Sequence, residues 1–93
     1  MRTEARHNTE ATRYELVSDG RVVSVAEYRM RGETFVFTHT ETAKELRGNG
    51  LAGRLVEFAL DDVRLGGGTV IPRCPFVRNF IEAHPQYGDL LAA

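Results

Sequence analysis

The chain has 93 residues and a mass of 10.4 kDa, enough for one compact domain with a single small core. The chain has twelve Lys and Arg residues and thirteen Asp and Glu residues, which gives a net charge of −1. The sequence contains no cluster of basic residues, which argues against a nucleic-acid-binding protein. The polar start contains no apolar run typical of a signal peptide or a membrane span, so we expect a cytoplasmic protein without a membrane or nucleic-acid partner.

The first half of the chain predicts an antiparallel meander. Residues 1–10 are polar and are expected to be flexible. Three apolar-rich segments follow, separated by turn residues, and each is predicted as a strand: residues 14–17, 22–30 and 34–40. In the third segment Phe35, Phe37 and His39 alternate with other residues, which predicts that these three side chains share one face of the sheet.

The second half of the chain changes to helical spacing. Apolar residues from Leu51 to Val63 form a wide stripe opposite charged residues, which indicates an amphipathic helix that packs on the sheet and ends at Gly66. Residues 69–71 are a short apolar strand, and Pro75 suits the first position of a second helix. The predicted order is β-β-β-α-β-α in one α+β (or α/β) domain over residues 1–93, with a mixed, mostly antiparallel sheet.

The glycine-rich segment Arg47–Gly53 (RGNGLAG) lies between a predicted strand and a helix. Free N–H groups and the positive end of the helix dipole meet at such a turn, and Arg47 adds a cationic donor, so the turn suits a phosphate group. A dinucleotide-binding GxGxxG motif is rejected because a polar loop precedes the glycines, and a P-loop is rejected because Gly-Lys-Ser/Thr is absent. The third match, Arg47-x-x-Gly50-x-Ala52, fits the [QR]xxGx[GA] pattern of acyl-CoA N-acyltransferases, and a helix start without any ligand remains an alternative.

Four segments in order strengthen this third match: FTHTE at residues 37–41, RGNGLA at 47–52, VIPRCPFV at 70–77 and HPQY at 84–87. Together they resemble the short, cysteine-containing branch of the GNAT superfamily of N-acetyltransferases, over nearly the whole chain. The resemblance implies a GNAT-like fold and transfer of an acetyl group from acetyl-CoA to an acceptor. The acceptor is expected to be an amine of a protein or a metabolite.

The resemblance also implies where coenzyme A would bind. The pyrophosphate would lie on the backbone amides of one run of residues: Arg47, Gly48, Asn49, Gly50, Leu51 and Ala52. The pantetheine arm would lie along Thr40, Glu41 and Thr42, and Asn79 would contact the cofactor from the second helix. In larger members of the superfamily two further N-terminal helices help to form the acceptor site, and this chain lacks room for them.

Cys74 and His39 are the candidate catalytic residues. Cys74 precedes the second helix, where the helix dipole and Arg73 favour a thiolate, although a small buried residue is the alternative interpretation. His39 is interpreted either as a base or proton relay or as a structural histidine of the core. Cys74 is the sole cysteine and the histidines lack metal-ligand spacing, so no metal site is expected.

The chemical route remains open at this stage. The acceptor attacks the thioester directly, or Cys74 first takes the acetyl group as an acyl-cysteine. Two other functions are compatible with the sequence: a non-catalytic module that binds or senses coenzyme A or acyl-CoA, and an interaction domain without a ligand.

Overall fold

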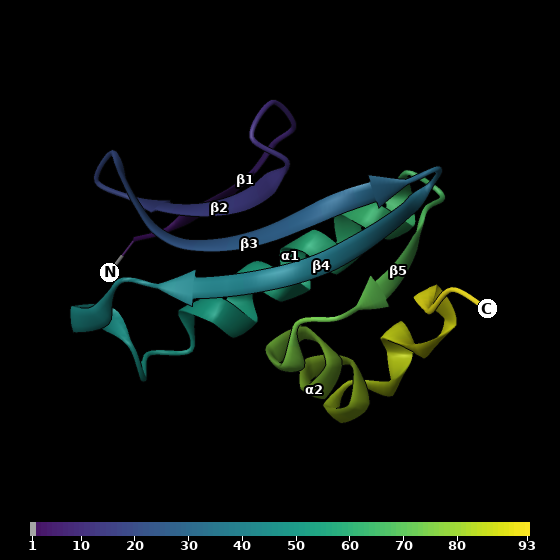
Figure 1. Cartoon of the computed structure of the whole chain (residues 1–93). Coiled ribbons are helices and arrows are strands. Elements are labelled where there is room, and N and C mark those ends of the chain that lie inside the picture. Colours follow the sequence, from purple (N-terminus) through teal and green to yellow (C-terminus); the bar gives the residue numbers. More distant parts are fainter. Residues whose placement is uncertain (1) are drawn as a thin grey trace.

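The computed structural model, which describes residues 2–93, contains one five-stranded sheet with two helices packed on the same face (Figure 1). The strands are β1 (Glu4–Asn8), β2 (Arg13–Ser18), β3 (Arg21–Arg31), β4 (Thr34–Thr42) and β5 (Thr69–Pro72). The helices are α1 (Leu51–Leu65) and α2 (Pro75–Ala83), with short 3-10 helices η1 (Lys44–Leu46) and η2 (Pro85–Leu90). Spatial strand order follows chain order, with β1 to β4 antiparallel and β4–β5 parallel, which confirms the predicted mixed sheet.

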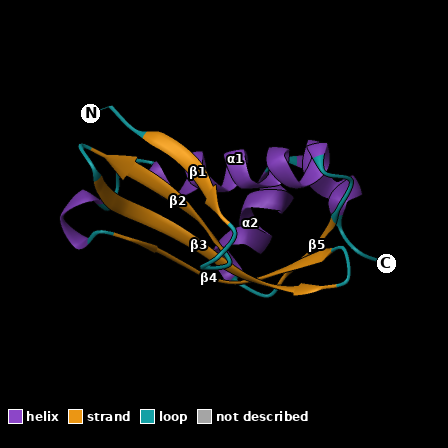
Figure 2. Cartoon of the chain, turned by 90° about the horizontal axis from the view of Figure 1, so that it is seen from above, coloured by secondary structure: helices purple, strands orange, loops and turns teal. Residues whose placement is uncertain are grey.

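The core lies between the helices and one face of the sheet, and the other face is not covered by any helix of the described chain (Figure 2). The predicted apolar stripe of α1 is buried there: Leu51, Leu55, Val56, Ala59, Leu60 and Val63. Tyr14, Phe37 and Val70 face it from β2, β4 and β5 and are 0–1% exposed. A helix with one apolar side and a sheet with one apolar face stabilise each other by removing both surfaces from water.

Strand β1 replaces the flexible segment expected at residues 1–10, so the order contains one more strand than predicted. Its alternation places Ala5 and His7 towards the core, opposite Leu16 and Tyr14 of β2. The His7 ring stacks on Tyr14 with 4.0 Å between ring centroids, and its Nε2 lies 2.6 Å from the Tyr28 hydroxyl. The polar sequence concealed this strand, because its inward side chains are a small alanine and a histidine that finds partners only in the folded molecule.

A register shift separates the two halves of β4. Tyr28 of β3 pairs with Phe37, but Glu27 pairs with His39, so Thr38 is an extra residue without a partner. Beyond it the alternation is reversed: Thr40 faces the helices, and His39 points to the open face. The expectation that His39 shares a face with Phe35 and Phe37 is therefore wrong, since one inserted residue exchanges the two faces.

Strand β5 pairs with only the first half of β4, from Thr34 opposite Thr69 to Phe37 opposite Pro72. The amide of Cys74 then donates to the Phe37 carbonyl at 2.9 Å, and the chain turns into α2. In the part of the chain that the structure describes, residues 38–42 of β4 thus have no strand partner on this side. This free edge lies beside the start of α1 and defines where a ligand can bind. No helix within residues 2–93 is long and apolar enough to cross a membrane.

Candidate active site

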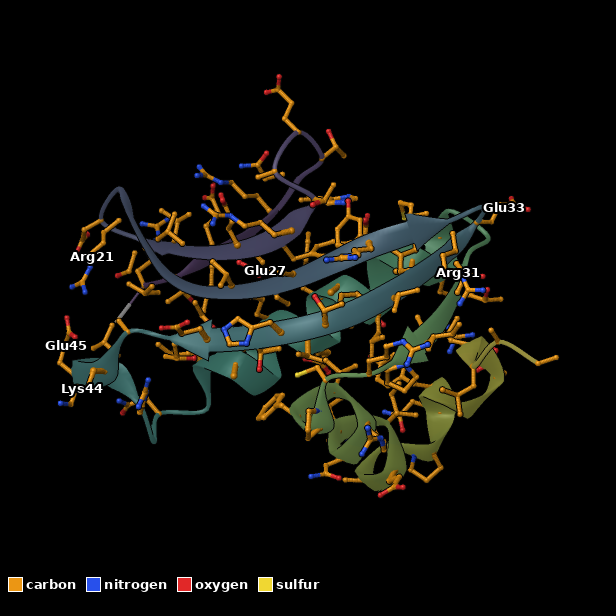
Figure 3. All side chains as sticks on the ribbon, viewed as in Figure 1. Arg21, Glu27, Arg31, Glu33, Lys44 and Glu45 are labelled. Carbon is orange, nitrogen blue, oxygen red and sulfur yellow. The ribbon has the colours of Figure 1, made fainter. Side chains whose placement is uncertain are left out.

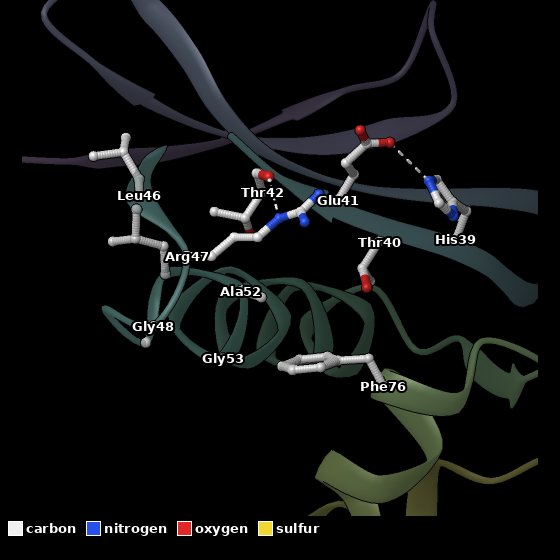
Figure 4. A pocket seen from close by; sticks show the side chains of 12 residues that line it. His39, Thr40, Glu41, Thr42, Leu46, Arg47, Gly48, Ala52, Gly53 and Phe76 are labelled. Carbon is white, nitrogen blue, oxygen red and sulfur yellow. Dashed lines mark hydrogen bonds and ion pairs between the residues drawn. The ribbon is translucent and has the colours of Figure 1, made fainter. Parts of the chain in front are cut away.

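A cavity of about 630 Å³ lies between the free edge of β4, the start of α1 and Phe76 of α2 (Figure 4). Its lining comes from four segments: His39, Thr40, Glu41 and Thr42 of β4; Leu46, Arg47 and Gly48 of the following turn; Gly50, Leu51, Ala52 and Gly53 at the α1 start; and Phe76. One wall is a strand edge with free backbone groups and the other is a helix N-terminus. This combination suits a long ligand with a polar chain and a phosphate-bearing end.

The glycine-rich turn presents an unusual number of free amides. Gly48 and Gly50 have φ values of +87° and +73°, which glycine adopts at little cost. The first helical hydrogen bond of α1 runs from the Arg54 amide to the Gly50 carbonyl at 3.1 Å. Among the described residues, the amides of residues 48–53 donate to no backbone or side-chain acceptor. These amides, at the positive end of the α1 dipole, form an anion-binding concavity.

Two side chains fix the conformation of this turn, one by a hydrogen bond to β4 and the other by a hydrogen bond to η1. The Arg47 Nε donates to the Thr42 carbonyl at 3.3 Å, which keeps the guanidinium over the cavity wall. The Asn49 Nδ2 donates to the Leu46 carbonyl at 2.9 Å, so Asn49 braces the turn from outside the cavity. The first turn of α1 contains no acidic residue, and the local field therefore favours an anion.

Cys74 caps α2 from a buried position, with 5% of the residue exposed. Its Sγ lies 3.6 Å from the Thr40 Oγ1, and Thr40 lines the cavity. The thiol is thus placed directly behind the strand edge, at the point where β4 and β5 separate. A reactive carbonyl bound along this edge would approach both groups.

His39 lies on the opposite side of β4 from this thiol. Its Nε2 is 3.0 Å from the Glu41 Oε1, and both side chains are more than half exposed (Figure 4). The hydrogen bond with His39, followed by the charge of its ring, lowers the pKa of the Glu41 carboxyl. The structure therefore pairs Cys74 with Thr40 and His39 with Glu41, and it does not bring the two expected catalytic side chains together.

Eight of the ten residues that were expected to bind coenzyme A line the cavity. The other two, Asn49 and Asn79, are not part of its lining. Asn79 is exposed on α2, one turn beyond Phe76. Phe76, Gly53 and Leu46 line the cavity and were missed. No sequence signal distinguished Phe76, because its helical spacing resembles that of the buried residues of α2, and only the structure shows that it stays 39% exposed.

Tyr87 is excluded from the cavity by its own contacts. Its hydroxyl donates to the Asp61 Oδ1 at 2.8 Å, and the residue is 4% exposed. Burial, followed by this hydrogen bond and the Asp61 charge, raises the pKa of Tyr87 to about 12. Tyr87 thus attaches η2 to α1, and it does not belong to the cavity lining among the described residues.

The fold and this site define a class of protein: an α+β domain with a glycine-rich helix start beside a separating pair of parallel strands. A scan against family models matches residues 13–90 to the GCN5-related N-acetyltransferase family. The chain therefore belongs to this family. No protein among the curated sequences matches the chain significantly.

Solved structures agree on the fold. The solution structure of a GCN5-like protein from Staphylococcus aureus has a TM-score of 0.73 at 18% identity, covering 97% of this chain and 88% of that chain. The ribosomal-protein-S18-alanine N-acetyltransferase from Escherichia coli has a TM-score of 0.63 at 13% identity, covering 76% of this chain and 49% of that one. An IAA acetyltransferase from Bacillus cereus has a TM-score of 0.56 at 18% identity, with 76% and 51% coverage. The chain thus spans about half the length of the latter two.

Proposed function

We propose that the chain transfers an acetyl group from acetyl-CoA to the amine of an acceptor. The observation that carries this proposal is the run of six free amides at residues 48–53, beside an unpaired strand edge. Family membership supports the reaction class, and the chemistry of the turn supports the ligand.

The residues present fit coenzyme A in two ways. Free amides and Arg47 can bind a pyrophosphate, and a Cβ built at Gly48 or Gly50 meets nothing within 4 Å, so an anion can approach the backbone closely. The free edge of β4 at Thr40–Thr42 can pair with the amides of the pantetheine arm, as an added strand would. Phe76 covers the opposite side of this path.

The chain's own residues divide the chemistry between the two faces of β4. Acetyl-CoA supplies an acetyl group activated as a thioester. On the inner face, Cys74 can act as a proton donor to the leaving thiolate or take the acetyl group first, with Thr40 as its hydrogen-bonding neighbour. On the outer face, His39 can remove a proton from the incoming amine, and Glu41 orients its ring and stabilises the imidazolium.

Thermal melting with four ligands tests the cofactor assignment. Acetyl-CoA and coenzyme A are expected to raise the melting temperature, because a ligand that binds only the folded state stabilises it by mass action. NAD and ATP serve as controls that share the adenine and the phosphates. Equal shifts with all four, or no shift with any, would contradict the assignment. Release of the coenzyme A thiol in the presence of primary amines then distinguishes an enzyme from a module that only binds coenzyme A.

A further inference from the structure

We propose that the open face of the sheet beside the free edge of β4 binds the acceptor through an anionic group. The acceptor is then an amine that also bears a carboxylate or a phosphate. This inference deepens the proposed function and rests on it. It identifies Arg29, Arg31 and Arg73 as residues that determine acceptor specificity.

Strand geometry places these three arginines on one surface. Arg29 and Arg31 are two residues apart on β3, and Arg29 pairs with Val36 of β4. Val36 in turn pairs with Ile71 of β5, and Arg73 follows Ile71 by two residues. Both helices pack on the other face of the sheet, so no helix of the described residues covers this surface. Figure 3 shows Arg31 near the turn between β3 and β4.

The arginines surround a depression of about 400 Å³ with an apolar floor. Its lining is Arg29, Met30, Arg31, Val36, Thr38 and Arg73. Val36, with 4% of the residue exposed, lies at the bottom of the depression. A floor of this kind accepts the methylene groups of a small ligand, while the rim binds its charge.

The charges of these arginines are not compensated within residues 2–93. No carboxylate oxygen lies within 4.0 Å of the guanidinium groups of Arg29, Arg31 or Arg73. Four other arginines do have such partners: Arg6 and Arg13 with Glu15, Arg21 with Glu45, and Arg64 with Asp89. Glu27, two residues before Arg29 on the same face, is the nearest acid along β3, and among the described residues it forms no ion pair.

Guanidinium groups bind carboxylate and phosphate oxygens through paired N–H donors. Three of them without counter-charges attract an anion and repel a purely cationic amine. We therefore infer that the second functional group of the acceptor is acidic.

The depression lies beside the candidate active site along β4. Thr38 lines the depression and His39 lines the cavity, and the two are successive residues of the free edge. Arg73 likewise precedes Cys74 in the chain. One residue of a strand spans about 3.3 Å, so an anion near Thr38 leaves an amine a few bonds away close to His39. His39 faces this same open side, where it can accept the amine proton.

The first measurement compares matched acceptors in a thiol-release assay with acetyl-CoA. The pairs are 4-aminobutyrate with butylamine, 6-aminohexanoate with hexylamine, and O-phosphoethanolamine with ethanolamine. We expect at least one anionic member to have a kcat/KM about tenfold higher than its neutral partner. Comparison of the preference in the two carboxylate pairs with that in the phosphate pair then shows which anionic group the site binds.

Arginine variants test the location. Arg31→Gln and Arg73→Gln are expected to reduce the anionic preference about tenfold through KM, and Arg73→Lys is expected to restore it partly. Arg2→Gln removes an exposed arginine at the other end of the sheet and serves as the control. The thermal shift with coenzyme A should be the same in all of these variants.

A titration of the 15N-labelled protein with 6-aminohexanoate and with hexylamine separates this inference from the proposed function. Amide shifts at Val36, Thr38 and Arg73 with the anionic probe alone support the acceptor site, even if no acetylation occurs. Three results would overturn the inference while leaving the transferase activity standing. They are equal turnover of both members of every pair, an anionic preference that persists when Arg31→Gln and Arg73→Gln are combined, and the absence of amide shifts at these residues.

Discussion

At the scale of single residues, the contact between Cys74 and Thr40 leads to a direct test of the chemical route. If Cys74 carries the acetyl group, incubation with acetyl-CoA adds the mass of one acetyl group to the protein, and Cys74→Ala abolishes the adduct. Thr40→Val is expected to slow its formation, because the hydroxyl beside the Cys74 Sγ is lost. Intact-protein mass spectrometry measures the adduct. An adduct that persists in Cys74→Ala would contradict the acyl-cysteine route.

Glu15 is a second residue with a measurable consequence. Burial by itself raises the pKa of this carboxyl, but hydrogen bonds from Arg6 at 2.7 Å, Arg13 at 2.6 Å and Asn8 at 3.1 Å outweigh burial and lower the pKa to about 2. The folded-state pKa lies below the ordinary value of 4.5, so this group stabilises the fold above about pH 4.5 and the stabilisation is lost as the pH falls towards 2.

We expect Glu15→Gln to reduce the free energy of unfolding by about 2 kcal/mol at pH 7 and by much less near pH 2. Urea unfolding at a series of pH values measures this difference. Glu45→Gln is a suitable control, because the Glu45 ion pair with Arg21 is exposed on both sides and exposed pairs stabilise little. A Glu15→Gln penalty independent of pH would show that the carboxylate charge is not the cause.

At the scale of elements, the turn before α1 determines whether the helix start can bind an anion. Gly50→Ala is expected to weaken coenzyme A binding about tenfold, because a methyl group enters the open space above the free amides. It should also destabilise the fold by about 1 kcal/mol, since φ is +73°. Isothermal titration calorimetry and urea unfolding measure the two effects.

Gly32→Ala separates these two effects. Gly32 has a φ of +61° in the turn between β3 and β4, with nothing within 4 Å of a built Cβ, and it lies outside the cavity. Its substitution is expected to cost similar stability without changing the affinity for coenzyme A. If both variants lose affinity equally, the loss arises from destabilisation, and the anion-binding assignment of the turn is wrong.

The inserted residue at Thr38 is the other decisive feature at this scale. It exchanges the faces of β4 and so directs Thr40 inward towards Cys74 and His39 outward beside Glu41. Within residues 39–41, β4 therefore directs side chains both to the buried thiol and to the open face of the sheet. Strand β5 separates from β4 at the same level, which leaves the edge free where the faces exchange.

At the scale of the whole molecule, β1 completes the core at the end opposite the cavity. His7 lies between Tyr14, Tyr28 and Asp62, and its Nδ1 is 3.2 Å from the Asp62 Oδ2. Burial, followed by the hydrogen bond to Asp62 and the Asp62 charge, raises the pKa of Tyr14 far above its ordinary value. These contacts connect the first strand to α1 across the sheet.

Deletion of residues 2–9 is expected to lower the free energy of unfolding by about 3 kcal/mol, because the ladder to β2 and the cover over Tyr14 are both lost. His7→Ala retains the strand and should cost about 1–2 kcal/mol. Urea unfolding followed by circular dichroism measures both. An unfolding midpoint unchanged by the deletion would indicate that β1 contributes nothing to stability.

Local patterns in the sequence were sufficient for much of this description. The amphipathic period of α1, the strand character of β3 and β4 and the glycine-rich turn before the helix each depend on neighbours a few residues apart, and each was predicted correctly. The family resemblance agreed with the family match over residues 13–90. These features belong to the chain itself.

Only the tertiary structure decided the remaining features, because they depend on contacts between distant residues. The pairing of β1 with β2, the face exchange at Thr38 and the approach of Cys74 to Thr40 follow from strand register, which no local pattern encodes. The convergence of three unpaired arginines on the open face has the same origin. The sequence by itself therefore determined the elements from β2 to α2 and the class of reaction, whereas the folded sheet added β1 and determined which side chains share an environment.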